Sequence, residues 1–256
     1  MSAQSHASKV APVKQQVAVI IPAWNEAGRI AATVRATAAL PYVDLVLVVD
    51  DGSADATQAI ARDSGAVVMR HPHNRGKAEA MQTGAAVVAM RDREGAPPRH
   101  LLFLDADLGD SAANSTPLIE AVVAGRTDVA IAVIPQQTGA GSRGFALSLA
   151  RRSIRQATGF SAQAPMCGIR CLTRQAFEAV IPLAHGWGVE TAMTIDLLNA
   201  GFSVEEIPCN LKHRASGSDL RGLLHRATQY RDVLVAVTAR GVKSAARDAA
   251  GRVARA

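Results

Sequence analysis

The sequence is poor in cysteine, in aromatic residues and in long apolar runs. Aromatic residues make up 4% of its 256 residues, and the cysteines are three, Cys167, Cys171 and Cys209. So few thiols, without CxxC spacing, exclude a disulfide framework and a cysteine zinc site. We expect them to be reduced, as in a cytoplasmic protein. No run comes near the roughly 18 apolar residues of a spanning helix, and residues 1–16 lack the apolar segment of a secretory signal.

Positive charge is in excess only at one end of the chain. The net charge is +6, and the segment from Arg221 onward carries eight Lys and Arg against two acids. The preceding residues balance at 20 basic and 20 acidic. A nucleic-acid-binding body should carry a basic face through its fold, so we expect no nucleic acid partner. The basic end has two interpretations. It is either a solvated tail or a segment that makes a peripheral contact with the inner surface of an anionic membrane.

Short apolar segments alternate with helical patterns in the first half. The expected strands are Val17–Pro22, Leu45–Val49, Ala66–Met69, Leu101–Leu104 and Val129–Ile134. The expected helices are Glu26–Leu40, one capped by Asp55 with Gln58 and ending at Gly65, Lys77–Arg91, and Pro117–Ala124. Uniformly apolar strands separated by helices are typical of a parallel sheet that helices cover on both faces. The fold class is therefore α/β.

The second half is less regular but has no linker. Helices are expected at Phe145–Ala157, at Glu190–Asn199 and from Leu220 onward, with extended segments at Cys167–Leu172 and Phe202–Ile207. We therefore expect a disordered tail over 1–16, a single domain over 17–240 and a basic tail over 241–256.

Acidic residues follow three of the expected strands. Glu26, Asp51 and the pair Asp105 and Asp107 stand where those strands end, and ligands bind at the carboxyl ends of parallel strands. Two-residue spacing in extended chain turns both carboxylates of the pair to one side. Such a pair suits Mg²⁺ or Mn²⁺, which complete their shell with water and substrate phosphate. Acids near helix starts also stabilise the helix dipole, which is the structural alternative.

A glycine and a lysine open the third expected helix. Gly76 permits close backbone approach, and Lys77 at a helix N-terminus attracts phosphate. A glycine turn with a solvated lysine is the alternative. Neither the P-loop pattern nor a dinucleotide-binding GxGxxG after the first strand occurs, which excludes those two nucleotide sites.

Four segments form a specific set in this order. They are Val17–Glu26 (VAVIIPAWNE), Val48–Ser53 (VVDDGS), Asn74–Gly84 (NRGKAEAMQTG) and Phe103–Leu108 (FLDADL). Together they resemble the family-2 glycosyltransferases, which have the GT-A fold. The resemblance implies a mostly parallel central sheet with helices on both faces. It also makes residues 17–135 a nucleotide-sugar half and residues 136–240 an acceptor half.

The resemblance further implies roles for individual residues. Nucleotide-sugar binding is implied for Pro22, Ala23, Asn25, Glu26, Asp51, Lys77 and Asp105. Lys77 would lie near the diphosphate and Asp105 near the ribose or the sugar. Asp107 would be a catalytic residue that holds Mg²⁺ or Mn²⁺, and the metal would neutralise the departing diphosphate. The donor would be of the UDP-glucose or GDP-mannose type.

Two segments of the second half resemble particular branches of the family. Gly186–Glu190 (GWGVE) is similar to glucosyl-3-phosphoglycerate synthases, and Ile207–Gly217 (IPCNLKHRASG) to the HRxxG region of polyprenyl-phosphate sugar synthases. The resemblance implies a metal role for His213 and a catalytic, sugar- or acceptor-binding role for Glu190. Contact with the acceptor or a phosphate is implied for Arg170 and Arg214.

The reaction expected from the sequence is metal-dependent transfer of a hexose to a phosphate- or hydroxyl-bearing acceptor. Polyprenyl phosphate is slightly favoured, and a small soluble acid is the alternative. A nucleotide-sugar-binding regulator without turnover is a third reading. Thr191 follows Glu190 where inverting members often have a second acid. The catalytic base and the stereochemical outcome therefore stay open. The sequence also leaves open the donor base and sugar, the acceptor and the oligomeric state.

Overall fold

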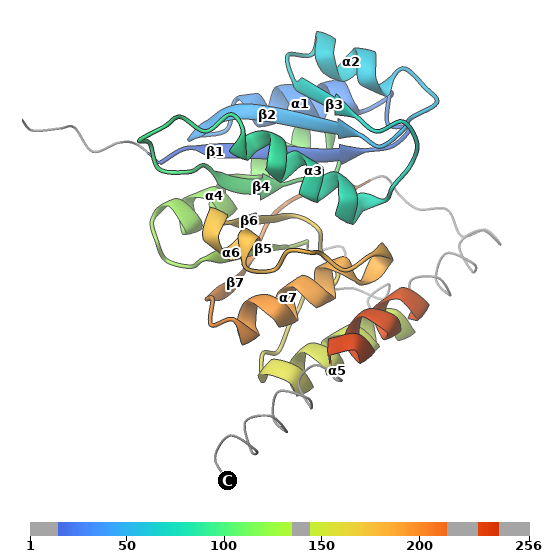
Figure 1. Cartoon of the computed structure of the whole chain (residues 1–256), viewed down its shortest axis with the longest axis vertical. Helices are drawn as coiled ribbons and strands as arrows, with labels where there is room; N and C mark the ends of the chain where they lie inside the picture. The colour runs from blue at the N-terminus through green and yellow to red at the C-terminus, as the bar shows by residue number, and fades with distance from the viewer. Residues whose placement is uncertain (1–14, 135–143, 214–229, 241–256) are drawn as a thin grey trace, which may run out of the picture.

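A seven-stranded sheet forms the centre of the computed structural model, which describes residues 15–134, 144–213 and 230–240 (Figure 1). The strands are β1 (Val17–Ala23), β2 (Val43–Asp50), β3 (Val67–Arg70), β4 (His100–Phe103), β5 (Val129–Val133), β6 (Arg170–Leu172) and β7 (Val204–Pro208). Their order is β3-β2-β1-β4-β6-β5-β7. Only β6 runs antiparallel to its neighbours β4 and β5. The mostly parallel sheet predicted from the sequence is confirmed.

Helices pack on both faces of this sheet. The α-helices are α1 (Ile30–Ala38), α2 (Thr57–Asp63), α3 (Lys77–Ala89), α4 (Thr116–Val123), α5 (Phe145–Thr158), α6 (Arg174–Glu178) and α7 (Val189–Asn199). The 3-10 helices η1 (Gly109–Ser115) and η4 (Gly186–Gly188) precede α4 and α7, and residues 230–240 are helical. Strands β1, β2 and β3 follow one another outward, and the chain then returns to place β4 on the other side of β1. Right-handed crossovers therefore put α3 on the face opposite α1 and α2, in front of the strands in Figure 1.

The strands of the first half could be predicted from the sequence because they are almost completely buried, and buried strands are uniformly apolar. Every residue of β5 is buried, and β1 is buried except at Pro22. Helix α3 reaches β1 through Gly84, since a Cβ at this position would lie 2.4 Å from Cγ2 of Ile20. A side chain there would push the helix off the sheet. The sheet and α3 thus leave no room between them for a larger residue.

Helix α1 begins later than its sequence pattern predicts. The pattern starts at Glu26, but the helix starts at Ile30. The backbone amides before it bond instead to the loop after β2 and to the start of α2. The Asn25 amide donates to Oγ of Ser53 (2.9 Å), and the Glu26 amide donates to Oγ1 of Thr57 (2.8 Å). These bonds join the loops that follow β1 and β2, and Asn25 takes a left-handed conformation (φ 56°) to allow it.

The capping box predicted at Asp55 is wrong. Helix α2 starts at Thr57, and its N-cap residue Ala56 makes no side-chain capping bond. The Asp55 carboxylate accepts hydrogen bonds from the amide of Thr57 (3.0 Å) and the amide of Ala27 (3.2 Å). Gln58 does not reach back to the cap, since its Oε1 accepts a bond from Arg70 (3.1 Å). Asp55 therefore bonds both the first residue of α2 and the loop after β1, without the reciprocal bond of a capping box.

Strands from both predicted halves share the single sheet. Strand β6 lies between β4 and β5, and β7 pairs with β5. Helices α5, α7 and 230–240 lie together beyond this end of the sheet (Figure 1), where Ile154, Ile195 and Val237 meet in a small apolar cluster. The predicted tails, apart from residues 15 and 16, and the start of the last predicted helix lie outside the described residues.

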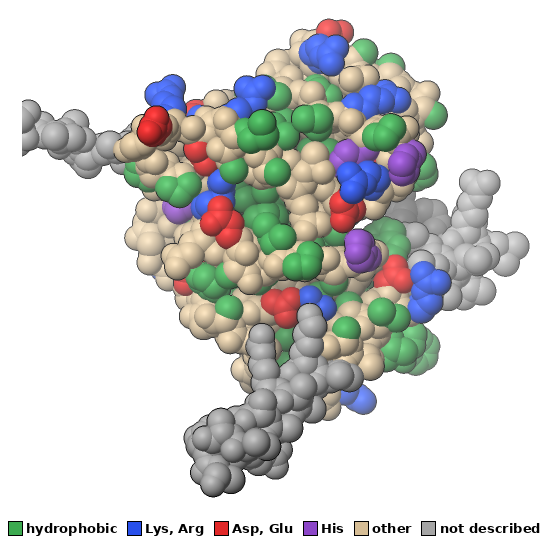
Figure 2. Space-filling view, in the orientation of Figure 1, with side chains coloured by type: hydrophobic (Ala, Val, Ile, Leu, Met, Phe, Trp, Pro, Cys, Tyr) green, Lys and Arg blue, Asp and Glu red, His purple; other side chains and the backbone are tan. Residues whose placement is uncertain are grey.

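Two further features concern the charge on the surface and the apolar length of the helices. Basic and acidic side chains are interspersed on the face that Figure 2 shows, without one continuous basic area. This agrees with the balanced charge of the first 220 residues. None of the described helices has both the length and the apolar character needed to cross a bilayer.

Candidate active site

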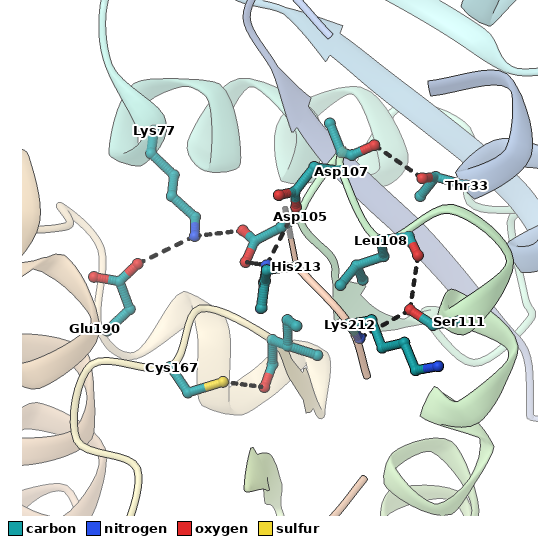
Figure 3. A network of polar contacts seen from close by, with 12 residues as sticks. Thr33, Lys77, Asp105, Asp107, Leu108, Ser111, Cys167, Glu190, Lys212 and His213 are labelled. Atoms are coloured by element: carbon teal, nitrogen blue, oxygen red, sulfur yellow. Dashed lines mark hydrogen bonds and ion pairs between the residues drawn. The ribbon is translucent and has the colours of Figure 1, made fainter. Parts of the chain in front are cut away.

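Charged side chains from four separate parts of the chain meet at the carboxyl edge of the sheet (Figure 3). Lys77 starts α3, Asp105 and Asp107 follow β4, Glu190 lies in the first turn of α7, and His213 follows β7. All five were predicted as site residues, and the structure brings all five together. This is the edge at which open parallel sheets bind their ligands.

Lys77 connects two of the carboxylates. Its Nζ lies 2.7 Å from Oδ1 of Asp105 and 3.2 Å from Oε1 of Glu190. Burial alone would lower the pKa of Lys77, but the two carboxylates outweigh it and raise this pKa above its usual range. The amine therefore stays charged at neutral pH.

Gly168 makes room for this lysine. A Cβ at this position would lie 2.1 Å from Nζ of Lys77 and 3.2 Å from Oε1 of Glu190. The glycine is thus part of the wall of the site, and it is not among the site residues predicted from the sequence.

Glu190 is nearly buried, with 6% of its surface exposed. It lies in the first turn of α7, at the positive end of the helix dipole. Its backbone carbonyl accepts a bond from the hydroxyl of Thr194 (2.9 Å). The following Thr191 is buried and donates its hydroxyl to the Pro165 carbonyl (3.1 Å). The side chain after Glu190 is therefore occupied by a hydrogen bond in the interior of the fold.

Asp107 and His213 form a second pair beside the first. Nδ1 of His213 lies 3.2 Å from Oδ1 of Asp107 and 3.9 Å from Oδ2 of Asp105. The hydrogen bond with Asp107, aided by the charge of both aspartates, raises the pKa of His213 despite the opposing effect of burial.

These two side chains fit a divalent cation. Ligands at neighbouring corners of an octahedral Mg²⁺ lie about 3 Å apart, which matches the separation of the two atoms. Within the described part of the chain, no group of three His, Cys, Asp or Glu side chains is arranged to hold a metal ion. An ion held by this pair would therefore need water and substrate oxygens to complete its shell, as Mg²⁺ commonly does in phosphate-handling sites.

Asp51 supports the site from within the fold. Its Oδ1 and Oδ2 accept hydrogen bonds from the amides of Arg75 and Gly76, both at 2.8 Å. Nδ1 of His71 lies 2.7 Å from the same Oδ1, and Nε2 of His71 lies 2.9 Å from Oγ1 of Thr83. The carboxylate predicted to touch the nucleotide thus shapes the turn before Lys77.

Sequence reasoning missed the buried His71. Its position one residue after β3, at the same edge as the acids, is the signal that marks it.

The remaining predicted nucleotide residues line the end of β1. Pro22 is half-buried, Ala23 is buried, Asn25 is exposed and Glu26 is half-buried. The Ala23 carbonyl accepts a bond from the Asp51 amide (2.8 Å), and Oδ1 of Asn25 accepts one from the Ala54 amide (2.8 Å). The structure therefore joins this strand end to the loop after β2.

The family model for glycosyl transferase family 2 matches residues 18–180. The chain belongs to this family. It is 28% identical over 216 residues to Glycosyltransferase AglJ of Haloferax volcanii, spanning 81% of this chain and 67% of that protein. It is 29% identical over 234 residues to Polyprenol monophosphomannose synthase of Mycolicibacterium smegmatis, spanning 84% and 87%. It spans 32% of the length of a further relative, Glycosyltransferase AglD.

Solved structures agree with the fold of a family-2 glycosyltransferase. The structure of glucosyl-3-phosphoglycerate synthase from Mycobacterium tuberculosis with Mg²⁺ and UDP matches with a TM-score of 0.71 at 22% identity. The match covers 88% of this chain and 79% of that one. At this identity the likeness establishes the GT-A fold.

The acceptor contact predicted for Arg170 is wrong in this glycosyltransferase. Arg170 is fully buried in β6, and its guanidinium donates to the carbonyl oxygens of Cys167 (2.5 Å) and Glu190 (3.5 Å). It holds the loop of Gly168 against the start of α7, behind the site. Arg214, the other predicted contact, lies outside the described residues.

Proposed function

We propose that this glycosyltransferase moves a hexose from a nucleotide-diphosphate sugar, of the UDP-glucose or GDP-mannose type, to an acceptor with the help of a divalent cation. The single observation that carries the proposal is the Asp107–His213 pair directly beside the Lys77–Asp105–Glu190 cluster. The imidazole ligand favours Mn²⁺ over Mg²⁺, since Mg²⁺ prefers oxygen ligands.

Each protein group has a distinct task in this proposal. A bound cation would neutralise the charge that develops on the leaving diphosphate. The Lys77 ammonium and the positive end of the α3 dipole attract the same diphosphate. Asp51 keeps the turn before Lys77 in place through the amides of Arg75 and Gly76. Asp105 positions the Lys77 amine and faces the ribose or the sugar.

The acceptor that we favour is a polyprenyl phosphate. A phosphate oxygen is already anionic at neutral pH and attacks the sugar without a general base, whereas a hydroxyl group needs one. Glu190 is paired with Lys77, and the next side chain, Thr191, is used inside the fold. The similarity to Polyprenol monophosphomannose synthase over 87% of its length supports the same acceptor class. Glu190 would then bind a hydroxyl of the sugar or of the acceptor.

A lipid acceptor also gives the basic end of the chain a role. We propose a peripheral contact with an anionic membrane, at the inner surface of a cytoplasmic membrane. Leu234 and Val235 on the helix 230–240 support it, because they are 42% and 63% exposed next to the exposed Arg231. Apolar and basic side chains on one helix face suit binding in the headgroup region.

The proposal is tested with the full chain and MnCl₂. Each of UDP-glucose and GDP-mannose is incubated with undecaprenyl phosphate in detergent or with 3-phosphoglycerate, and nucleoside diphosphate release and product mass are followed. We expect a glycosyl lipid phosphate. A glycosylated phosphoglycerate would establish the soluble-acceptor alternative. Donor binding without turnover under all conditions would establish the regulator instead.

A further inference from the structure

Two hydroxyl groups, one buried and one half-buried, hold the loop that carries Asp107. The first belongs to Thr33 of α1, which is fully buried. Its Oγ1 donates to the Ala106 carbonyl and accepts from the Gly109 amide, both at 2.8 Å. These groups flank Asp107 on either side in the chain. Thr33 therefore fixes the backbone of the loop to α1, independently of any ligand.

The second hydroxyl belongs to Ser111 in η1 and reaches a different part of the chain. Its Oγ donates to the Leu108 carbonyl (2.7 Å) and accepts from the Lys212 amide (3.0 Å) (Figure 3). Leu108 directly follows Asp107, and Lys212 directly precedes His213. One side chain thus joins the backbones next to both members of the pair.

The segment that carries His213 depends on such contacts for its position. Sheet pairing of β7 with β5 ends at Pro208, and one more backbone bond joins the Cys209 amide to Val133 (3.0 Å). Beyond it, the buried side chain of Leu211 anchors the segment, and Asn114 donates to the Asn210 carbonyl (2.7 Å). Among the described side-chain bonds to the backbone of this segment, the one from Ser111 lies nearest to His213.

We propose that Ser111 is a positioning residue that sets the spacing of Asp107 and His213 for a shared divalent cation. The inference rests on the proposed metal-dependent function. It differs from a general stabilising role, because Ser111 ties two segments that are 101 positions apart in the sequence. Loss of its hydroxyl should leave both segments folded but let the two ligands drift apart.

The chain offers a matched control in the same short helix. Ser115 is buried, and its Oγ donates to the Ala112 carbonyl (2.7 Å), three residues earlier, as Ser111 donates to Leu108. This bond stays within η1. Ser115→Ala therefore removes a comparable local bond and leaves the link to Lys212 intact. Ser111→Thr keeps the hydroxyl, and its methyl group has room because Ser111 borders a surface hollow with Arg29 and Asn114.

The experiment measures Mn²⁺ binding in the presence of UDP by the electron paramagnetic resonance signal of free Mn²⁺. We expect Ser111→Ala to weaken Mn²⁺ binding roughly three- to tenfold, the effect of one lost hydrogen bond. Ser111→Thr and Ser115→Ala should stay within about twofold of the wild type, well below the effect of that lost bond. The Mn²⁺ concentration that half-saturates turnover should shift in parallel for Ser111→Ala, while kcat at saturating Mn²⁺ changes less.

Three outcomes would overturn the inference. Wild-type affinity in Ser111→Ala would contradict it alone and leave the proposed function standing. Equal weakening in Ser115→Ala would assign the effect to loosening of η1 as a whole. No Mn²⁺ binding by the wild-type chain would reject the proposed metal site together with the role of Ser111.

Discussion

Nδ1 of His213 lies 3.2 Å from Oδ1 of Asp107, although the two residues are 106 positions apart in the sequence. The sheet order explains this contact. Strand β4 leads to Asp107 and β7 leads to His213, and both strands end at the same edge. The two halves of the chain therefore each contribute one member of the pair.

Replacing Gly168 by alanine should disturb Lys77 without unfolding the protein. The new Cβ would lie 2.1 Å from Nζ of Lys77, and the end of a lysine side chain moves easily. We expect kcat/KM for the donor to fall about tenfold, which is a loss of about 1.4 kcal/mol in transition-state binding. Steady-state kinetics with each donor measures this. Gly144→Ala is the control, because a Cβ there meets nothing within 4 Å. Equal activity of the two variants would show that Lys77 need not occupy this place.

Replacing His71 by alanine should loosen the turn before Lys77. The buried imidazole contacts Asp51 and Thr83, and its removal leaves the buried Asp51 and the half-buried Thr83 without this partner. We expect the free energy of unfolding to fall by about 1–3 kcal/mol, with a higher KM for the donor. Urea unfolding and donor kinetics measure the two effects. The exposed His73 is the matched control. Unchanged KM in a destabilised His71 variant would restrict His71 to a role in stability.

The cysteines should resist alkylation in the native protein. Burial raises the pKa of the Cys209 thiol to about 11 and that of Cys167 to about 12, so at pH 8 about one Cys209 thiol in a thousand is ionised. Iodoacetamide labelling read by mass spectrometry should modify all three cysteines in urea and none quickly without it. Because unfolded thiols ionise near pH 9 and native ones do not, the free energy of unfolding should fall as the pH rises above 9. Fast native labelling would contradict the described burial.

The membrane contact predicts binding to anionic vesicles. Full-length protein should co-sediment with phosphatidylglycerol vesicles at low salt and less at high salt, since charge screening weakens the contact. The double variant Leu234→Glu and Val235→Glu should bind less, because it removes apolar surface and adds negative charge to the exposed helix face. Binding equal to the wild type would exclude this face. Phosphatidylcholine vesicles provide the uncharged control.

The sequence predicts the parts of the site that are local in the chain. Lys77 follows a glycine at a helix start, and Asp105 and Asp107 follow an apolar strand, so their position at the sheet edge can be read from neighbouring residues. The contacts that hold the loop of Asp107 in place cannot be read in this way. Thr33 bonds to a residue 73 positions away and Ser111 to one 101 positions away, and no pattern around either hydroxyl indicates its partner.

The wrong predictions for Asp55 and Arg170 have the same physical cause, which is contact with residues far away in the sequence. Asp55 has the spacing of a helix cap, but its carboxylate also bonds the amide of Ala27 in another loop. Arginine is a residue type that commonly binds phosphate, but the antiparallel strand β6 is inserted between β4 and β5 and places Arg170 in the interior. The position of β6 between β4 and β5 is determined by the assembled sheet. It cannot be predicted from the charge of one short segment.

The most direct test of metal-dependent donor cleavage is nucleoside diphosphate release by Asp107→Asn beside the wild type, with MnCl₂, with EDTA, and with MnCl₂ restored after EDTA. We predict that EDTA stops the wild-type reaction reversibly and that Asp107→Asn is slower by at least about 100-fold, since a metal contributes several kcal/mol to the transition state. Thermal unfolding of the variant should match the wild type. Full turnover in EDTA, or full turnover by the folded Asp107→Asn protein, would contradict the account.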